Sequence, residues 1–79
     1  MDPQELGEFI RRRRKELGMT QEELARKVGI SRQVLINLEK GKIGSIRFIK
    51  LWGLLRELGY DFCVIKWNPF KRQELECEE

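Results

Sequence analysis

Residues 20–41 read TQEELARKVGISRQVLINLEKG, and the architecture of the chain follows from this stretch. Thr20 is a preferred N-cap residue and Glu23 follows three positions later, so the two residues form a capping box that starts a helix. Gly29 follows the expected last turn of this helix. Helices commonly end there with a residue in the left-handed conformation, which glycine adopts without a Cβ clash. We therefore predict a helix over about 21–28.

A second helix follows almost at once. Ser31 is its N-cap, the helix is expected over about 31–40, and Gly41 ends it. Because the turn is too short for the two helices to run antiparallel, the stretch predicts a helix-turn-helix. A general helical hairpin is the alternative, but it does not require a small residue, a glycine and inward apolar residues at these offsets. The inward residues are Leu24, Ala25, Val28, Leu35 and Leu38.

This pattern resembles the helix-turn-helix of the lambda-repressor/Cro family, also called the XRE family. The resemblance covers about 6–59 and implies a mostly α, compact domain of four or five helices over 1–59. It also implies DNA binding, usually as a dimer. The residues that carry the resemblance are Gln21, Leu24, Ala25, Val28, Gly29, Ile30, Leu35 and Leu38.

In such a domain the helix over 31–40 is the recognition helix, whose first residues reach base edges in the major groove. Matched to the family pattern, the base-contacting residues are Ser31, Arg32, Gln33 and Asn37. Arginine suits guanine, glutamine and asparagine suit adenine, and serine suits either a base or a phosphate. Val34 is expected to face outward, where it could contact a thymine methyl group.

Other residues are expected to hold the DNA backbone. Gln21 lies in the first turn of its helix, where its amide and the neighbouring N–H groups could bind a phosphate. The family resemblance implies the same role for Lys42, Ser45 and Arg47. Ile36 departs from the family pattern, which is commonly polar at this position, so it could pack against the next helix or a partner.

The chain begins with another helix. Asp2 and Pro3 are a typical N-cap and first-turn pair, and Gly18 ends the helix. The resemblance implies that Arg14 in this helix pairs with Glu39 at the end of the recognition helix. Such a pair would be bidentate and structural, and breaking it would destabilise the domain more than breaking an exposed pair.

The charge distribution is compatible with a polyanionic partner. Four of the thirteen acidic residues lie in the run ELECEE over 74–79, so residues 1–73 hold sixteen Lys/Arg against nine Asp/Glu, a net charge of +7. A heavily solvated surface explains the charged content equally well. The same two interpretations, solvation or loose attraction to phosphates, apply to three residues of the run RRRRK: Arg11, Arg12 and Lys15.

A fourth helix is predicted over about 45–58, and it carries more apolar residues than one buried stripe needs. The next stretch, YDFCVIKW over 60–67, is rich in aromatic and β-branched residues and predicts a strand. Since no second strand is evident, we expect this strand to pair with its copy in a homodimer. A fifth helix is the alternative. The expected interface residues are Tyr60, Phe62, Cys63, Val64, Ile65 and Trp67.

This layout is similar to that of HipB-like antitoxins, a branch of the family in which a C-terminal strand forms an intermolecular sheet and a tail engages a toxin. Here the dimerisation strand would occupy 60–68, followed by a charged tail over 69–79. Two functions therefore stay open. The first is a dimeric transcriptional repressor that reads an inverted repeat, and the second is an antitoxin that also binds a toxin protein. A protein-only adaptor fits the base-reading residues less well.

Several classes of function are disfavoured. The chain has no histidine and no evident nucleophile–base spacing, so we expect no enzyme activity and no cofactor. Its two cysteines, Cys63 and Cys77, do not form a CxxC pair, which argues against a zinc site. No apolar run is long enough to span a membrane. Together with the absence of a signal peptide, these features predict a cytoplasmic protein with reduced cysteines.

Overall fold

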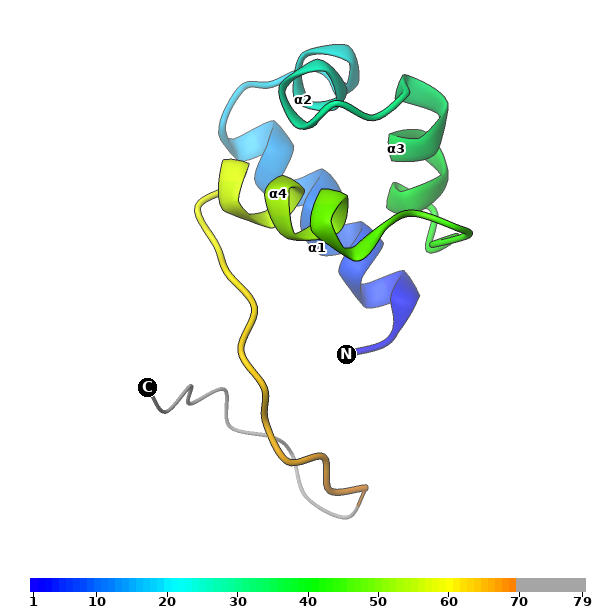
Figure 1. Ribbon diagram of the computed structural model, residues 1–79. Helices are drawn as coiled ribbons and strands as arrows, with labels where there is room; N and C mark the ends of the chain where they lie inside the picture. The colour runs from blue at the N-terminus through cyan, green and yellow to red at the C-terminus, as the bar shows by residue number, and fades with distance from the viewer. Residues whose placement is uncertain (70–79) are drawn as a thin grey trace.

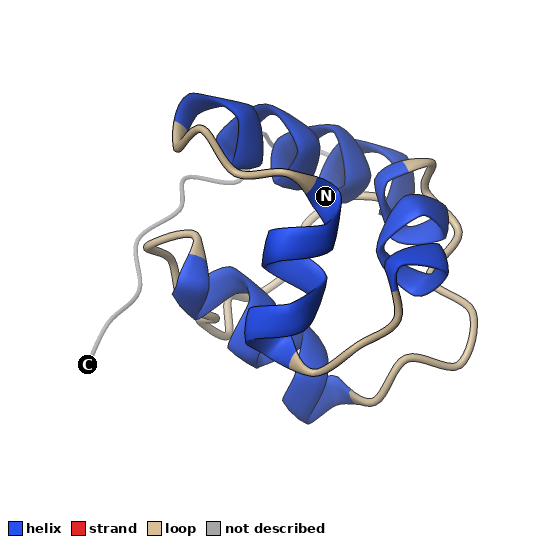
Figure 2. Ribbon diagram, turned by 90° about the horizontal axis from the view of Figure 1, so that it is seen from above, coloured by secondary structure: helices blue, strands red, loops and turns tan. Residues whose placement is uncertain are grey.

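The helical body, residues 3–58, contains four helices: α1 (Pro3–Glu16), α2 (Gln21–Val28), α3 (Arg32–Glu39) and α4 (Phe48–Glu57). The computed structural model describes residues 1–69. Helix α1 packs against α3, and α2 packs against both α3 and α4, so each helix covers part of a common interior (Figures 1 and 2). The expectation of a mostly α domain is confirmed.

Helix α1 starts where the sequence predicts. The side chain of Asp2 accepts the backbone N–H of Glu5 at 2.8 Å, and Pro3 occupies the first helical turn. This hydrogen bond favours the ionised carboxylate and lowers the pKa of Asp2 below its ordinary value. The helix ends at Glu16, ahead of Gly18, which has a φ of 69°.

The two helices of the central stretch also form as predicted. Both halves of the capping box are present, with Thr20 accepting the N–H of Glu23 at 3.1 Å and the Glu23 carboxylate accepting the N–H of Thr20 at 3.4 Å. Gly29 has a φ of 81° and ends α2 in the left-handed conformation. Ser31 accepts the N–H of Val34 at 3.1 Å and caps α3. The tight turn sets α3 across α2 rather than alongside it (Figure 1).

The start of the fourth helix differs from the prediction. Helix α4 begins at Phe48, not at Ser45, and its N-cap position is held by Arg47, which makes no side-chain capping bond. Residues 43–46 form a turn instead, with Gly44 at a φ of 61° and the N–H of Ile46 donating to the backbone oxygen of Ile43 at 3.5 Å, and Ile46 packs against the core.

The core is built from aliphatic side chains of all four helices. Gly7 allows α1 to approach α3 closely, because a Cβ atom at this position would lie 2.5 Å from the backbone oxygen of Leu38. Glycine here therefore sets the distance between the two helices. The largest fully buried side chains are Ile10, Leu24, Leu35, Leu38, Leu54 and Leu58.

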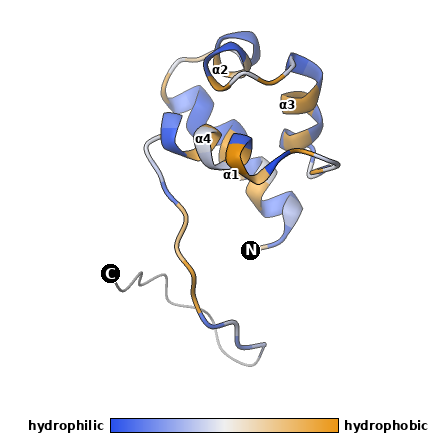
Figure 3. Cartoon of the chain, in the orientation of Figure 1, coloured by the Kyte–Doolittle hydropathy of each residue, from blue (hydrophilic) through white to orange (hydrophobic). Residues whose placement is uncertain are grey.

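The segment that follows α4 contradicts the prediction. Residues 60–68 form neither the predicted strand nor the alternative fifth helix, and no strand occurs anywhere in residues 1–69. The residue types favour a strand, but a strand also needs a backbone partner, and none of the described elements supplies one. The segment instead leaves the helical body, carrying a hydrophobic stretch with it (Figures 1 and 3).

The first residues of this C-terminal segment, 60–69, are attached to the helices by two ring contacts. The ring of Tyr60 packs edge-on against Phe9, and that of Phe62 packs against Phe48, with centroids 4.8 and 4.9 Å apart. Farther along, Val64 is fully exposed and Trp67 is 72% exposed. Most of the charged tail predicted over 69–79 lies outside the described residues.

Asp61 lies between Tyr60 and Phe62 in the sequence. Its carboxylate accepts two hydrogen bonds from side chains of α4. Its carboxylate is 2.6 Å from the indole nitrogen of Trp52 and 3.2 Å from the Arg56 guanidinium. It also accepts the backbone N–H of Phe62, and these interactions lower the pKa of Asp61, the Phe62 bond contributing most. The segment is therefore attached to α4 through a small, exposed set of contacts.

The expectation of reduced cysteines is wrong at Cys63, which is disulfide-bonded in the structure. Across residues 1–69, no helix is long and apolar enough to cross a membrane. The same residues contain no group of three or more side chains placed to hold a metal ion.

Candidate nucleic-acid interface

Helix α3 presents polar side chains to solvent on the face opposite its buried leucines. Arg32 and Gln33 in its first turn are exposed, and Asn37 one turn later is half-buried. The side-chain amide of Gln33 donates to the Asn37 side-chain oxygen at 3.0 Å, as residues four apart on one helix face can do. Gln33 and Asn37 thus form a connected amide surface beside the Arg32 guanidinium.

Ser31 and Val34 extend this surface toward the start of the helix. The Ser31 hydroxyl oxygen is occupied as the N-cap acceptor, which leaves its O–H free to donate to a phosphate or a base. Val34 is half-buried, so part of its side chain is accessible, as is part of Ile36. Ile36 is not among the residues that pack against the buried core.

A bidentate ion pair fixes the far end of α3 to α1. Arg14 Nε lies 2.8 Å from one carboxylate oxygen of Glu39, and its Nη2 lies 3.0 Å from the other. Both side chains are buried, with 9% and 4% of their surfaces exposed. The remaining Arg14 nitrogen donates to the backbone oxygen of Met19 at 2.9 Å. The pair therefore also orients the turn that leads into α2.

Gln21 belongs to the same cluster, and no pattern in the sequence indicates this. Its side-chain amide donates to Glu39 at 3.3 Å, and Gln21 is half-buried. The side chain therefore connects the first turn of α2 to the last turn of α3. The backbone N–H groups of Gln21 and Glu22 stay without intrahelical acceptors because they lie in the first turn. A phosphate contact at this point would rely mainly on the backbone.

The loop over 40–47 joins α3 to α4 and carries the two cations that were predicted to hold the DNA backbone, Lys42 and Arg47. The N–H of Lys42 donates to the backbone oxygen of Asn37 at 2.9 Å, which folds the loop back onto the helix. Lys42, Ser45 and Arg47 are all exposed. Neither cation makes an ion pair with any of the residues 1–69, so their charges are available to an external anion.

The predicted site residues are thus distributed over three neighbouring elements: the start of α2, the outer face of α3 and the loop before α4. These elements lie on one side of the molecule (Figure 1). The predicted interface residues 60–67 lie elsewhere, on the C-terminal segment. The arrangement combines amide and guanidinium groups for base edges with unpaired cations and backbone N–H groups for phosphates.

Comparisons with known proteins agree with this geometry. A family profile described as helix-turn-helix matches residues 10–65, more than half of the chain. Over 34 residues the chain is 67% identical to an uncharacterized HTH-type transcriptional regulator of Methanothermobacter thermautotrophicus. This match covers 43% of the chain and 49%, about half, of that relative.

Solved structures share the fold over a longer range. The clp gene regulator ClgR from Corynebacterium glutamicum is 29% identical in sequence to this chain, and the two structures superpose with a TM-score of 0.67. The match covers 75% of this chain and 62% of the ClgR chain. A chain of a HipA-HipB-O2-O3 complex is 24% identical in sequence and superposes with a TM-score of 0.70. The match covers 86% of this chain and 94% of the other, and at this identity the likeness shows a shared fold alone. The chain belongs to the helix-turn-helix family of the Cro/C1 type, the XRE family.

Proposed function

We propose that this protein is a sequence-specific DNA-binding transcriptional repressor that reads its operator with α3. The observation that carries the proposal is the set of exposed Arg32 and Gln33 and half-buried Asn37 on a helix whose other end is fixed by the buried Arg14–Glu39 pair. A rigid helix with exposed base-reading groups is what major-groove recognition requires. The relative from Methanothermobacter thermautotrophicus, named as a transcriptional regulator, supports the same function.

Each exposed residue has a role in this proposal. Arg32 pairs with guanine O6 and N7, while Gln33 and Asn37 pair with adenine. Ser31 donates its hydroxyl proton to a base or phosphate, and Val34 contacts a thymine methyl group. The backbone is held by Gln21, Lys42, Ser45 and Arg47.

The operator is an inverted repeat bound by a homodimer. Dimers of such domains place their recognition helices about 34 Å apart, one turn of DNA. Several apolar side chains of the chain are exposed and would be covered in a dimer. Phe48 and Ile49 on α4 are 62% and 60% exposed. The C-terminal segment adds four exposed side chains, Tyr60, Phe62, Val64 and Trp67, and two half-buried ones, Cys63 and Ile65.

The test is selection of tight-binding duplexes from a random pool, followed by gel shifts on single-base variants of the recovered site. We expect inverted half-sites about one helical turn apart, and Arg32→Ala to lose about 1–3 kcal/mol and the base preference at one position. Arg26→Ala is the matched control because Arg26 is exposed on α2 and, among residues 1–69, pairs only with Glu22, at 3.6 Å on the surface. Recovery of isolated half-sites would contradict the homodimer, and an unchanged preference in Arg32→Ala would contradict its role.

A second candidate function is that of an antitoxin, which adds binding of a toxin protein to the same DNA binding. The observation that favours it is the exposed apolar C-terminal segment, where Val64 is fully exposed and Trp67 is 72% exposed in a single chain. Co-expression with the product of the neighbouring gene tests this alternative. Co-purification that Val64→Ser/Trp67→Ser abolishes would support it, and separate elution of the two proteins would argue against it.

A further inference from the structure

The basic run over 11–15 divides into two groups by its contacts. Arg13 donates to the backbone oxygen of Leu58 at 2.9 Å, and Arg14 is in the buried pair. The other three cations, Arg11, Arg12 and Lys15, are exposed and make no ion pair with any described residue. Their charges are therefore not used to hold the fold together.

These three cations do not share one face of α1. Residues four positions apart lie on the same face of a helix and form a stripe along it. One stripe of α1 contains Gly7, Arg11 and Lys15. The neighbouring stripe contains Glu8, Arg12 and Glu16. The first stripe carries two positive charges and no negative one. The second carries one positive and two negative charges. The unbalanced positive charge of α1 is thus confined to the stripe of Arg11 and Lys15.

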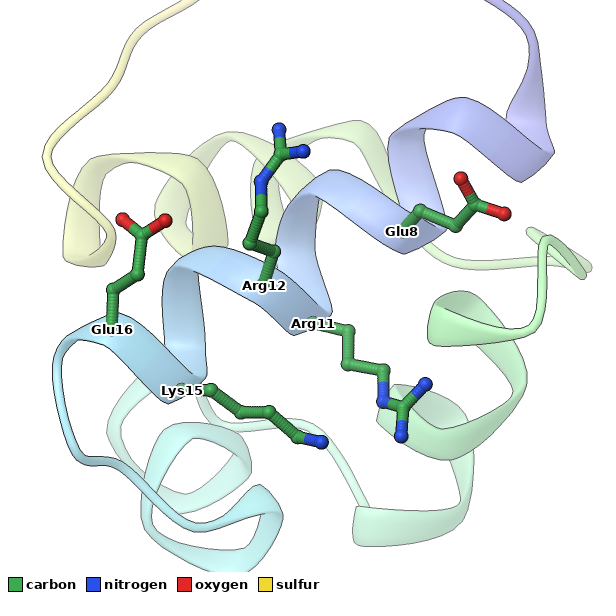
Figure 4. Close-up of a pocket in the computed structure, with 5 residues that line it drawn as sticks. All are labelled: Glu8, Arg11, Arg12, Lys15 and Glu16. Carbon is green, nitrogen blue, oxygen red and sulfur yellow. The ribbon is translucent and has the colours of Figure 1, made fainter.

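The position of Gly7 shows which side of α1 this stripe occupies. Gly7 lies against the backbone oxygens of Leu38 and Glu39, so the stripe begins at the contact with α3. Figure 4 shows a shallow hollow on α1 lined by residues of both stripes, with Arg11 and Lys15 extending toward the side of α2 and α3. Arg12 and Glu16 extend to the opposite side of the helix (Figure 4).

We propose that Arg11 and Lys15 form a phosphate-binding flank on α1 that contacts the DNA backbone beside the start of α2. Arg14, one position before Lys15, reaches Glu39, which also binds Gln21. The stripe therefore borders the cluster that orients the first turn of α2. This inference rests on the proposed function, since it extends the contact with DNA beyond the helix-turn-helix itself.

The local energetics of α1 favour the same interpretation. Two like charges four residues apart on a helix repel each other and slightly destabilise it. Neither Arg11 nor Lys15 has a carboxylate partner among residues 1–69 that would relieve this repulsion. A polyanion along the stripe would relieve it, because its phosphates place negative charge next to both cations.

The experiment measures the salt dependence of binding to two duplexes, one selected by the wild-type protein and one of random sequence. The flank variant is Arg11→Gln/Lys15→Gln. The control, Arg12→Gln/Lys27→Gln, removes the same charge from the neighbouring stripe of α1 and from the last turn of α2. All four residues are exposed and glutamine is a good helix former, so both variants should fold, as circular dichroism would verify.

We expect the slope of log K against log salt to become shallower by about 1.8 in the flank variant, because each phosphate that the protein neutralises adds about 0.9 to the slope. Affinity should fall by the same factor on both duplexes, and the base preference should stay unchanged. The control should lose less than half as much slope. Equal slopes in the two variants, with base preference retained, would overturn the flank alone. If selection with the wild-type protein recovers no duplex that it binds, the proposed function and the flank are overturned together.

Discussion

The helical body and the C-terminal segment show two ways in which a chain can follow its local sequence preferences. In residues 3–58 each preference finds a partner within the chain: Thr20 and Ser31 cap helices, and Arg14 meets Glu39. Residues 60–69 have equally strong strand preferences but no strand to pair with among the described residues, and they stay attached by a few exposed contacts. Within a single chain, a local preference thus becomes structure where another part of that chain supplies the complementary group.

The largest effect is expected where the helical body depends on a single buried pair. Glu39→Gln leaves the Arg14 guanidinium buried without a counter-charge and should lower the free energy of unfolding by about 3–5 kcal/mol. Arg14→Met/Glu39→Leu should recover much of this loss because no charge is left buried. Urea unfolding followed by circular dichroism measures both.

Glu16→Gln is the control for this prediction. Glu16 pairs with Arg13 at 3.3 Å on the surface, and its side chain is 53% exposed. Its loss should change stability by no more than about 1 kcal/mol. If Glu39→Gln and Glu16→Gln cost the same, the pair does not hold α1 and α3 together, and the contrast between the two regions weakens.

A smaller effect should separate two helical glycines of the body. A Cβ at Gly7 would meet the Leu38 backbone oxygen at 2.5 Å, whereas one at Gly53 meets only a methyl group of Val28 at 4.0 Å. Gly7→Ala should therefore destabilise the domain by about 1–3 kcal/mol, and Gly53→Ala should be neutral or stabilise it by up to about 1 kcal/mol. Thermal unfolding compares them, and a tolerated Gly7→Ala would show that α1 and α3 can separate without loss.

The smallest effect concerns the attachment of the C-terminal segment. The pKa of Asp61 lies below its ordinary value of 3.8, chiefly because the carboxylate accepts the Phe62 N–H and then the Trp52 indole. The attachment is therefore fully present above pH 3.8 and is lost as the pH falls through the lowered pKa. Trp52 fluorescence in a Trp67→Phe background should report this transition.

Asp61→Asn is the matched variant for this titration. It keeps the size of the side chain but removes the charge that titrates, so the fluorescence change should vanish. The urea midpoint of the helical body should stay the same in both proteins, because the attachment is exposed. A fluorescence midpoint at or above pH 3.8 would mean that the segment is not held by the ionised carboxylate.

Much of the helical body could be predicted from the sequence because its signals are short-range. Asp2, Thr20 and Ser31 start helices in the structure where the sequence places them. The start of α4 was predicted wrongly because Ser45 is a good N-cap residue by type. In the structure Ser45 lies in a turn over 43–46, and Ile46 packs against the core, which a capping rule does not consider.

The contacts between side chains of the candidate site were harder to predict from the sequence than the helices. The closeness of Arg14 and Glu39 came from the family resemblance, since 25 residues separate them and no local rule joins them. The bond from Gln21 to Glu39 was missed because it depends on how α2 and α3 cross. The bond between Gln33 and Asn37 was also missed, although their four-residue spacing could have indicated it.

An NMR titration with a duplex selected by the protein tests whether α3 is the helix that reads DNA. The measured quantity is the change in chemical shift of each backbone amide. We predict that the largest changes occur at the start of α2, along 31–37 of α3 and in the loop over 42–47. Smaller changes are expected at Arg11 and Lys15. If the largest changes fall on α4 and the C-terminal segment while α3 is unaffected, α3 is not the DNA-reading helix and the proposed function is wrong.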